Sequence, residues 1–221
     1  TTAALMRRCR DPDAIHPDVV SLGIAIAEGR IHGATERCLA MLNCFRQVIG
    51  ESYQAAADQA VSRHLDAFLR PQISYLVNAR PLTVAMGHAI RHLKMHISRL
   101  PPETTEEKAR NEVIDQIDHL VRSRIHVAAR AIVESALGKI ADGDVILTYG
   151  RSTLVQKLLV AAKDAGKRFR VILVTGSEAE GTTTADEVTE MLGPLDGAVD
   201  CTVVSIGSIG YVMRSASKVF L

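Results

Sequence analysis

Three regularly spaced histidines are the first residues whose types could do chemistry. His88, His92 and His96 lie at i, i+4 and i+8 in a segment with the apolar period of a helix. A pair at i and i+4 on one helix face is an established zinc-binding arrangement. Three at this spacing drift around the helix axis, however, and no acidic residue lies among them to complete a site. We therefore predict a solvated or interface stripe and no metal.

A second candidate is the junction formed by Gly150, Arg151 and Ser152, which follows a short apolar run and precedes a helical pattern. In α/β folds such strand-to-helix junctions bind anions through the free N–H groups of the helix N-terminus. The residues match neither the GxGxxG fingerprint nor a P-loop. They predict a weak anion or ligand site, with a serine N-cap beside an arginine as the ordinary alternative.

A third candidate is Arg80, which stands between two helical segments in the sequence Asn78-Ala79-Arg80-Pro81. An arginine exposed at such a corner would suit an acidic partner. A fixed helix–helix corner explains the same residues without any ligand, and both interpretations stay open. No Ser-His-Asp or Cys-His grouping can be located along the chain, so no catalytic residue is predicted.

The bulk composition disfavours several classes of protein. The 221 residues include 26 Lys+Arg and 25 Asp+Glu, so no strongly basic face is implied and nucleic acid is a poor partner. The four cysteines form no CxxC pair, which disfavours disulfides and Cys-based metal sites. We find no run of eighteen apolar residues and no signal peptide. We therefore expect a soluble cytoplasmic protein, without membrane contact and without a cofactor.

A helical domain is predicted over residues 1–142, and its helices must position the histidines and Arg80. Successive segments repeat apolar residues at i, i+3, i+4 and i+7. Pro71 is expected to break the chain in this part, because proline disrupts a helix interior. Thr104 and Glu107 match a capping box, from which one uninterrupted helix is predicted to run to about Ala141.

The period changes after residue 142. Short apolar runs that are typical of buried parallel strands alternate with helical segments, the runs being 145–149, 169–174, 199–206 and the beginning of a fourth at 218–221. This alternation predicts right-handed βαβ units, a parallel sheet and a second domain over residues 143–221. The fold class is therefore α/β. Because so few strands cannot cover a parallel sheet on both faces, we expect the sheet to be truncated here and the natural protein to continue past Leu221.

Motifs spread along nearly the whole chain occur in a specific order, namely Ile15-His16-Pro17 with Leu22-Gly23, Arg37 to Leu42, Arg80-Pro81-Leu82-Thr83, Asn111-Glu112 through Ala128-Ala129, Gly143 to Gly150, Arg168 to Val171 and Ser217 to Leu221. In this order and spacing they resemble the regulatory subunits of eukaryotic translation initiation factor two-B, the guanine nucleotide exchange factor for initiation factor two. Among these the delta subunits are the most similar.

The resemblance implies an N-terminal helical domain joined to a Rossmann-like C-terminal domain. It also implies assembly with the alpha and beta regulatory subunits in a decameric core, onto which the catalytic epsilon and gamma subunits dock. Such a core binds the alpha subunit of initiation factor two and senses its phosphorylation. The exchange chemistry belongs to epsilon, so the resemblance predicts a regulatory subunit that is not an enzyme.

Within this family, the helical half faces the alpha subunit of initiation factor two, and phosphorylation there adds roughly −1.5 to −2 charges. Arginine suits phosphate because its planar fork binds two oxygens at once. Arg30 and Arg37 flank the turn before the second helix and, with Arg80, are the predicted partner-binding residues. The ordinary alternative is that the first two are solvated or pair with Glu28 and Glu36.

A rival interpretation is enzymatic. The same fold serves sugar-phosphate isomerases that resemble methylthioribose-1-phosphate isomerase and place a catalytic cysteine just after the first strand of the α/β domain. In this sequence Gly150 takes that position, and glycine has no side chain that moves a proton. The regulatory subunit is therefore favoured, and Gly150, Arg151 and Ser152 would then line only a vestigial ligand site.

Overall fold

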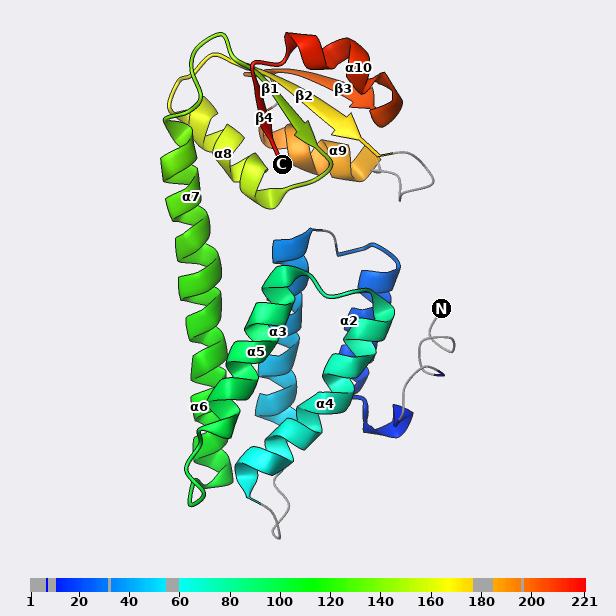
Figure 1. The fold of residues 1–221 in the computed structure, drawn as a ribbon, viewed down its shortest axis with the longest axis vertical. Helices are drawn as coiled ribbons and strands as arrows, with labels where there is room; N and C mark the ends of the chain where they lie inside the picture. Colours follow the sequence, from blue (N-terminus) through cyan, green and yellow to red (C-terminus); the bar gives the residue numbers. More distant parts are fainter. Residues whose placement is uncertain (1–6, 8–10, 32, 55–59, 177–184, 196) are drawn as a thin grey trace. The chain divides into compact units, whose positions relative to one another are not determined.

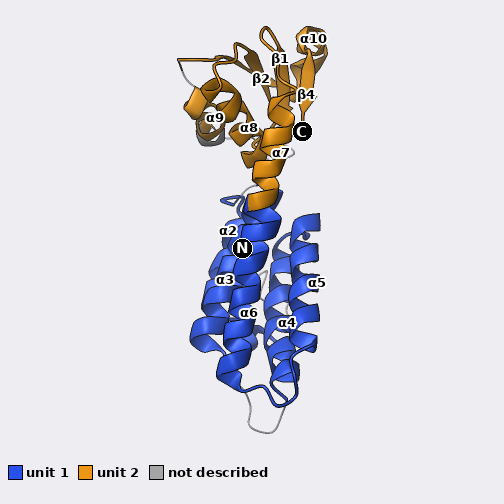
Figure 2. Ribbon diagram, turned by 90° about the vertical axis from the view of Figure 1, so that its left-hand side faces the viewer, with its two compact units in different colours: residues 1–126 blue, residues 127–221 orange. Residues whose placement is uncertain are grey.

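The structure is a computed structural model of the chain, and it describes all residues except 1–6, 8–10, 32, 55–59, 177–184 and 196 (Figure 1). The chain divides into two compact units, Thr1–His126 and Val127–Leu221 (Figure 2). The first is helical and the second is built on a parallel sheet. This confirms the predicted α/β class.

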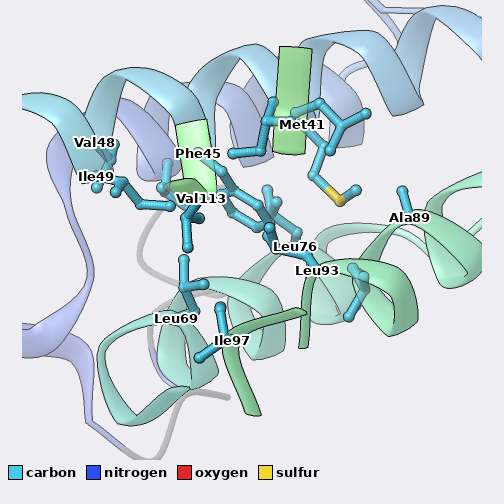
Figure 3. Packing of buried hydrophobic residues seen from close by; sticks show 14 of the residues in the cluster. Met41, Phe45, Val48, Ile49, Leu69, Leu76, Ala89, Leu93, Ile97 and Val113 are labelled. Atoms are coloured by element: carbon cyan, nitrogen blue, oxygen red, sulfur yellow. The ribbon is translucent and has the colours of Figure 1, made fainter. Parts of the chain in front are cut away.

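The helical unit is a bundle of amphipathic helices whose apolar faces meet in one aliphatic core. Figure 3 shows Met41, Phe45, Leu93 and Val113 packed together from three different helices, and all four side chains are fully or almost fully buried. Burial of side chains of this size contributes about 1.5–3 kcal/mol each, which is why the pattern in the sequence predicts the helices. The helices are α2 (Pro17–Ala27), α3 (Ala34–Ser52), α4 (Val61–Ala79), α5 (Val84–Ser98) and α6 (Glu106–Leu120).

The predicted break at Pro71 is wrong, since the residue lies inside α4. An interior proline costs about 3 kcal/mol because it removes one backbone hydrogen bond and crowds the preceding turn. The fully buried side chains of Leu65, Leu69 and Tyr75 on both sides of it outweigh that cost. Burial along the whole apolar face of α4 therefore outweighs the tendency of Pro71 to end the helix.

The predicted capping box is displaced by one residue. α6 begins at Glu106, and Thr105 rather than Thr104 is its N-cap, with the Thr105 hydroxyl accepting from the Lys108 N–H at 3.4 Å. Thr104 is buried instead. The capping-box pattern favours Thr104, because Lys108 rather than Glu or Gln stands three residues after Thr105, so tertiary burial of Thr104 decides which threonine caps the helix.

The predicted long helix is continuous in path but not uniform. After α6 a π-helical segment (Val121–Val127) precedes α7 (Ala128–Leu137). Although the sequence assigned residues up to 142 to the helical domain, the units divide before Val127. The reason is that apolar side chains at the end of this stretch, Val133, Leu137 and Ile140, pack into the α/β core. Among the described helices, none is long and apolar enough to cross a membrane.

The α/β unit contains a four-stranded parallel sheet in the order β3-β2-β1-β4. Figure 1 shows α8 (Thr153–Asp164) and α9 (Ala185–Leu192) on one face and α10 (Ile209–Val212) on the other. Alternate residues of a strand face opposite sides, so Ile146 packs in the α8 core while Leu147 belongs to the core that contacts α10. The four strands confirm the predicted runs, with bounds β1 (Val145–Tyr149), β2 (Arg170–Thr175), β3 (Asp200–Ser205) and β4 (Lys218–Phe220).

The buried carboxylate of Asp144 ties β4 to β1. It forms an ion pair with Lys218 and accepts hydrogen bonds from the Ser217 hydroxyl at 2.8 Å and from the Ala141 N–H at 2.6 Å. The hydrogen bond from Lys218, then those from Ala141 and Ser217, lower the pKa of Asp144 to about 2. The charged form of this side chain is therefore part of the folded structure.

We expect Asp144→Asn to destabilise the α/β unit at neutral pH and to have little effect near pH 2. A depressed carboxyl pKa stabilises the fold above the ordinary pKa of the group, and this contribution is lost as the pH falls toward about 2. Urea unfolding of both proteins between pH 6 and pH 2 measures the difference. Asp164→Asn, at an exposed carboxylate of α8, is the matched control. A difference for Asp144→Asn that does not change with pH would contradict the assignment.

Gly23 in α2 gives a second test, in the helical unit. A Cβ at this position would lie 2.3 Å from Cε1 of Tyr75, whose side chain is fully buried. We expect Gly23→Ala to lower the free energy of unfolding by about 1–3 kcal/mol through overpacking. Gly87→Ala in α5 meets nothing within 4 Å and should raise it by about 0.5–1 kcal/mol. Thermal unfolding followed by circular dichroism compares the two variants. Equal shifts of the melting temperature would contradict the close contact between Gly23 and Tyr75.

Candidate functional site

Arg37 lies in the first turns of α3 and is buried, with 7% of its surface exposed. Its position is fixed by the helix period, because Arg37 precedes the buried Met41 by one turn and belongs to the same face. Its Nη2 donates to the Pro81 carbonyl oxygen at 2.6 Å. Its Nε is buried and has no hydrogen-bond partner among the residues that the structure describes.

Arg80 lies at the C-cap of α4 and is exposed. Burial lowers the pKa of Arg37, and the charge of Arg80 nearby lowers it further. Over the described parts of the chain, no ion pair of either arginine with a carboxylate is present. A buried cation beside a second cation and without a counter-ion is costly unless an anion binds there. The two arginines therefore form a candidate anion-recognition site.

Arg30, the third predicted partner-binding residue, is engaged elsewhere. It is exposed after the end of α2, and its Nε lies 3.0 Å from Oε2 of Glu28. This is the pairing that the ordinary alternative proposed. Arg37 does not pair with Glu36 but donates to the Pro81 carbonyl oxygen. The structure thus brings Arg37 and Arg80 together and gives Arg30 a different partner.

The junction after β1 is occupied by interactions within the protein. The N–H of Gly150, whose φ is +59°, donates to the Val174 carbonyl oxygen at 2.8 Å. Arg151 pairs with Glu190 at 2.9 Å, and the Ser152 hydroxyl accepts from the Val155 N–H at 3.5 Å as the N-cap of α8. These contacts match the ordinary alternative for this junction, and its role as a vestigial ligand site stays a prediction.

The three histidines of the predicted stripe lie in different surroundings. His88 and His92 line a cavity of about 360 Å³, together with Cys38, whereas His96 is half-buried one turn further along α5. Burial raises the pKa of the Cys38 thiol to about 11. Within the residues that the structure describes, no group of three or more His, Cys, Asp or Glu side chains could hold a metal ion. The sequence analysis missed this cavity because its walls come from segments far apart in the chain.

Comparison with known proteins places this arrangement in a family. The profile of the Initiation factor 2 subunit family matches residues 30–221, so the chain belongs to that family. It is 40% identical over 211 residues to translation initiation factor eIF2B subunit delta of Schizosaccharomyces pombe. The match covers 95% of the chain but 44% of the relative, so the chain spans less than half the length of that protein.

Solved structures agree with the sequence match. The crystal structure of eIF2B delta from Chaetomium thermophilum superposes with a TM-score of 0.80 at 34% identity and covers 95% of this chain and 75% of that one. The tetrameric eIF2B beta2-delta2 complex of the same organism gives a TM-score of 0.81 at 35% identity, with 94% and 64% covered. The structural similarity thus extends over both units of the chain and points to delta-type subunits.

The family also contains enzymes. The chain is 28% identical over 189 residues to ribose 1,5-bisphosphate isomerase of Haloferax volcanii, which covers 85% of the chain and 55% of the relative. The rival class considered from the sequence, sugar-phosphate isomerases, is therefore represented among the relatives, although with a different sugar phosphate. The delta-type relative is more similar both in identity and in the share of the chain covered.

The lack of a counter-ion for Arg37 leads to a stability prediction. We expect Arg37→Met, which keeps the apolar stem and removes the charge, to raise the free energy of unfolding by about 1 kcal/mol. The loss of one hydrogen bond to Pro81 costs about the same as a typical net hydrogen bond and is outweighed by relief of the buried charge. Arg30→Met, at an exposed ion pair, should change it by less than about 1 kcal/mol. Urea unfolding measures both, and a clear loss of stability in Arg37→Met would contradict the interpretation.

Proposed function

We propose that the chain is part of a non-catalytic, delta-type regulatory subunit of the guanine nucleotide exchange complex for translation initiation factor two. The observation that carries this proposal is the similarity to delta subunits over nearly the whole chain, in sequence and in fold. In this role the chain binds other protein subunits and holds no cofactor. The nearly balanced charge supports protein partners over nucleic acid, and a translation factor of this kind works in the cytoplasm.

Assembly with a beta-type subunit is the first interaction that we propose. It is supported by the solved beta2-delta2 tetramer, in which a similar delta chain is associated with beta. By extension the chain takes part in the larger complex with the alpha regulatory subunit and the catalytic epsilon and gamma subunits. The role of this chain there is structural and regulatory.

Recognition of the alpha subunit of initiation factor two is the second proposed interaction, with Arg37 and Arg80 as the reader of its phosphorylated form. Arg80 is exposed and contacts the partner, whereas the buried Arg37 adds a fixed positive charge behind it. A phosphoserine supplies the counter-ion that these side chains lack. Arg30 is not part of this reader, because Glu28 already neutralises it.

The absence of catalysis is proposed from the junction after β1. A sugar-phosphate isomerase of this fold needs a proton-transfer group there, and loss of such a group typically costs a factor of 10² to 10⁴ in rate. Gly150 has no side chain, and its N–H is used by Val174. Its positive φ favours glycine over a residue with a Cβ. Isomerase activity is kept as the alternative because isomerases are among the relatives of the chain.

The proposal is tested by reconstituting the exchange complex with Arg80→Glu in the full-length subunit. We expect binding of the phosphorylated alpha subunit to weaken at least tenfold, because reversing the charge replaces attraction with repulsion. Binding of the unphosphorylated form should change less than twofold. Surface plasmon resonance with both forms measures the ratio.

Arg30→Glu is the matched control for this experiment, since it reverses a charge in the same unit that already has a partner. It should bind both forms as the wild type does. Equal losses for both forms in Arg80→Glu would indicate general docking, and unchanged binding would remove Arg80 from the reader. Failure of the variant chains and of the wild type to enter the complex would contradict the proposed assembly itself.

A further inference from the structure

The cavity beside His88 lies entirely within the helical unit and has the size of a small-molecule site. Its volume of about 360 Å³ falls within the range of about 300–1,000 Å³ typical of ligand pockets. Helices α3, α5 and α6 and the π-helical segment contribute its walls. These elements are close neighbours in the bundle, since α3 packs against α5 and α6 and α5 packs against α6. The cavity is therefore part of one compact unit and requires no other part of the chain.

Most of the wall is apolar. Apolar side chains from all four elements form it, namely Leu42, Ala85, Ala89, Leu120 and Ile125. Cys38 adds a thiol that burial keeps protonated, because its pKa is raised to about 11. A wall of this kind favours a hydrocarbon or aromatic body, whose transfer from water contributes about 25 cal/mol per Å² of buried surface.

The polar lining of the cavity includes an arginine and no carboxylate. His88, His92 and Arg124 are the polar lining residues besides the thiol, and no carboxylate lines the cavity. Arg124 is exposed and forms no ion pair with any residue that the structure describes, so its guanidinium is available to a ligand. The histidines supply additional N–H donors. The charge of the cavity thus matches an anionic head group.

The backbone that presents Arg124 is itself unusual. Arg124 and Ile125 belong to the π-helical segment Val121–Val127, the only departure from α geometry between α6 and α7 in this fully described stretch. π-helical turns are rare and occur frequently at functional sites. Their presence here places two lining residues, one charged and one apolar, in the cavity wall. This observation is independent of the shape and charge of the cavity.

We propose that this cavity binds a small molecule with an apolar body and one anionic head group, such as an aliphatic carboxylate. The body lies against Leu42, Ala89 and Leu120, and the head group contacts Arg124, with His88 and His92 beside it. This site is separate from the arginine pair proposed to read phosphate, because neither Arg37 nor Arg80 lines the cavity. The inference therefore does not depend on the proposed function.

Octanoate and octan-1-ol are suitable probes, since they share the apolar body and differ in charge. Isothermal titration of the whole chain should detect octanoate binding at one site and at least fivefold weaker binding of octan-1-ol. In Arg124→Gln, octanoate binding should weaken at least fivefold while octan-1-ol binding stays within twofold. Inorganic phosphate, which lacks the body, should not compete at the same concentration.

Arg122→Gln is the matched control, because Arg122 is an exposed arginine of the same π-helical segment that does not line the cavity. It should bind octanoate as the wild type does. Ala85→Leu, at an exposed lining position, should reduce the binding of both probes by filling the cavity. Circular dichroism checks that each variant is folded. No octanoate binding to the wild type, equal binding of the two probes, or equal losses in the two arginine variants would each overturn the proposal.

Discussion

The buried face of α3 is the constraint on which the helical unit depends. α3 packs against α2, α5 and α6, and its inward residues repeat with the helix period from Arg37 to Ile49. With aromatic residues at 4% of the sequence, this contact is made mainly by Leu, Ile, Val and Met side chains, which interdigitate at high density and tolerate little change in volume. The same period sets the direction of Arg37 and Cys38 at the start of the helix. The candidate anion site and the cavity are thus consequences of how α3 is packed.

The two units treat buried charge in opposite ways. In the α/β unit, Asp144 receives a cation and two further hydrogen-bond donors, so its charge is fully compensated and joins two strands. In the helical unit, Arg37 has one carbonyl oxygen and a neighbouring cation. Compensated buried charges are structural features, whereas uncompensated ones lower stability and persist where function needs them. This contrast is why the arginine pair, and not Asp144, is the better candidate for binding.

Relatives of this chain include proteins with different activities. Both a delta-type subunit and an isomerase match this chain over most of its length, and the activity of a protein depends on its site rather than on its fold alone. Here the junction after β1 is closed by a serine cap, an ion pair and a glycine whose N–H is already used. The polar groups of this junction are therefore used to fix its own loop within the protein. The two sites that we propose lie instead on the helical unit, where Arg80 and Arg124 are exposed.

The sequence by itself determined the elements whose signal is local and periodic. The apolar period of α3, the strand runs of β1 and β2 and the alternation of strands with helices all lie within short windows, so class and order followed from them. The resemblance carried in motifs such as Gly143 to Gly150 led to the family. The tertiary structure decided what depends on contacts between distant segments. Burial of both halves of α4 kept Pro71 inside a helix, and packing of Leu137 and Ile140 moved the boundary of the units to Val127. Contacts across the bundle buried Arg37 and formed the cavity beside His88, because the period of one helix does not show which side chains of other helices will face it.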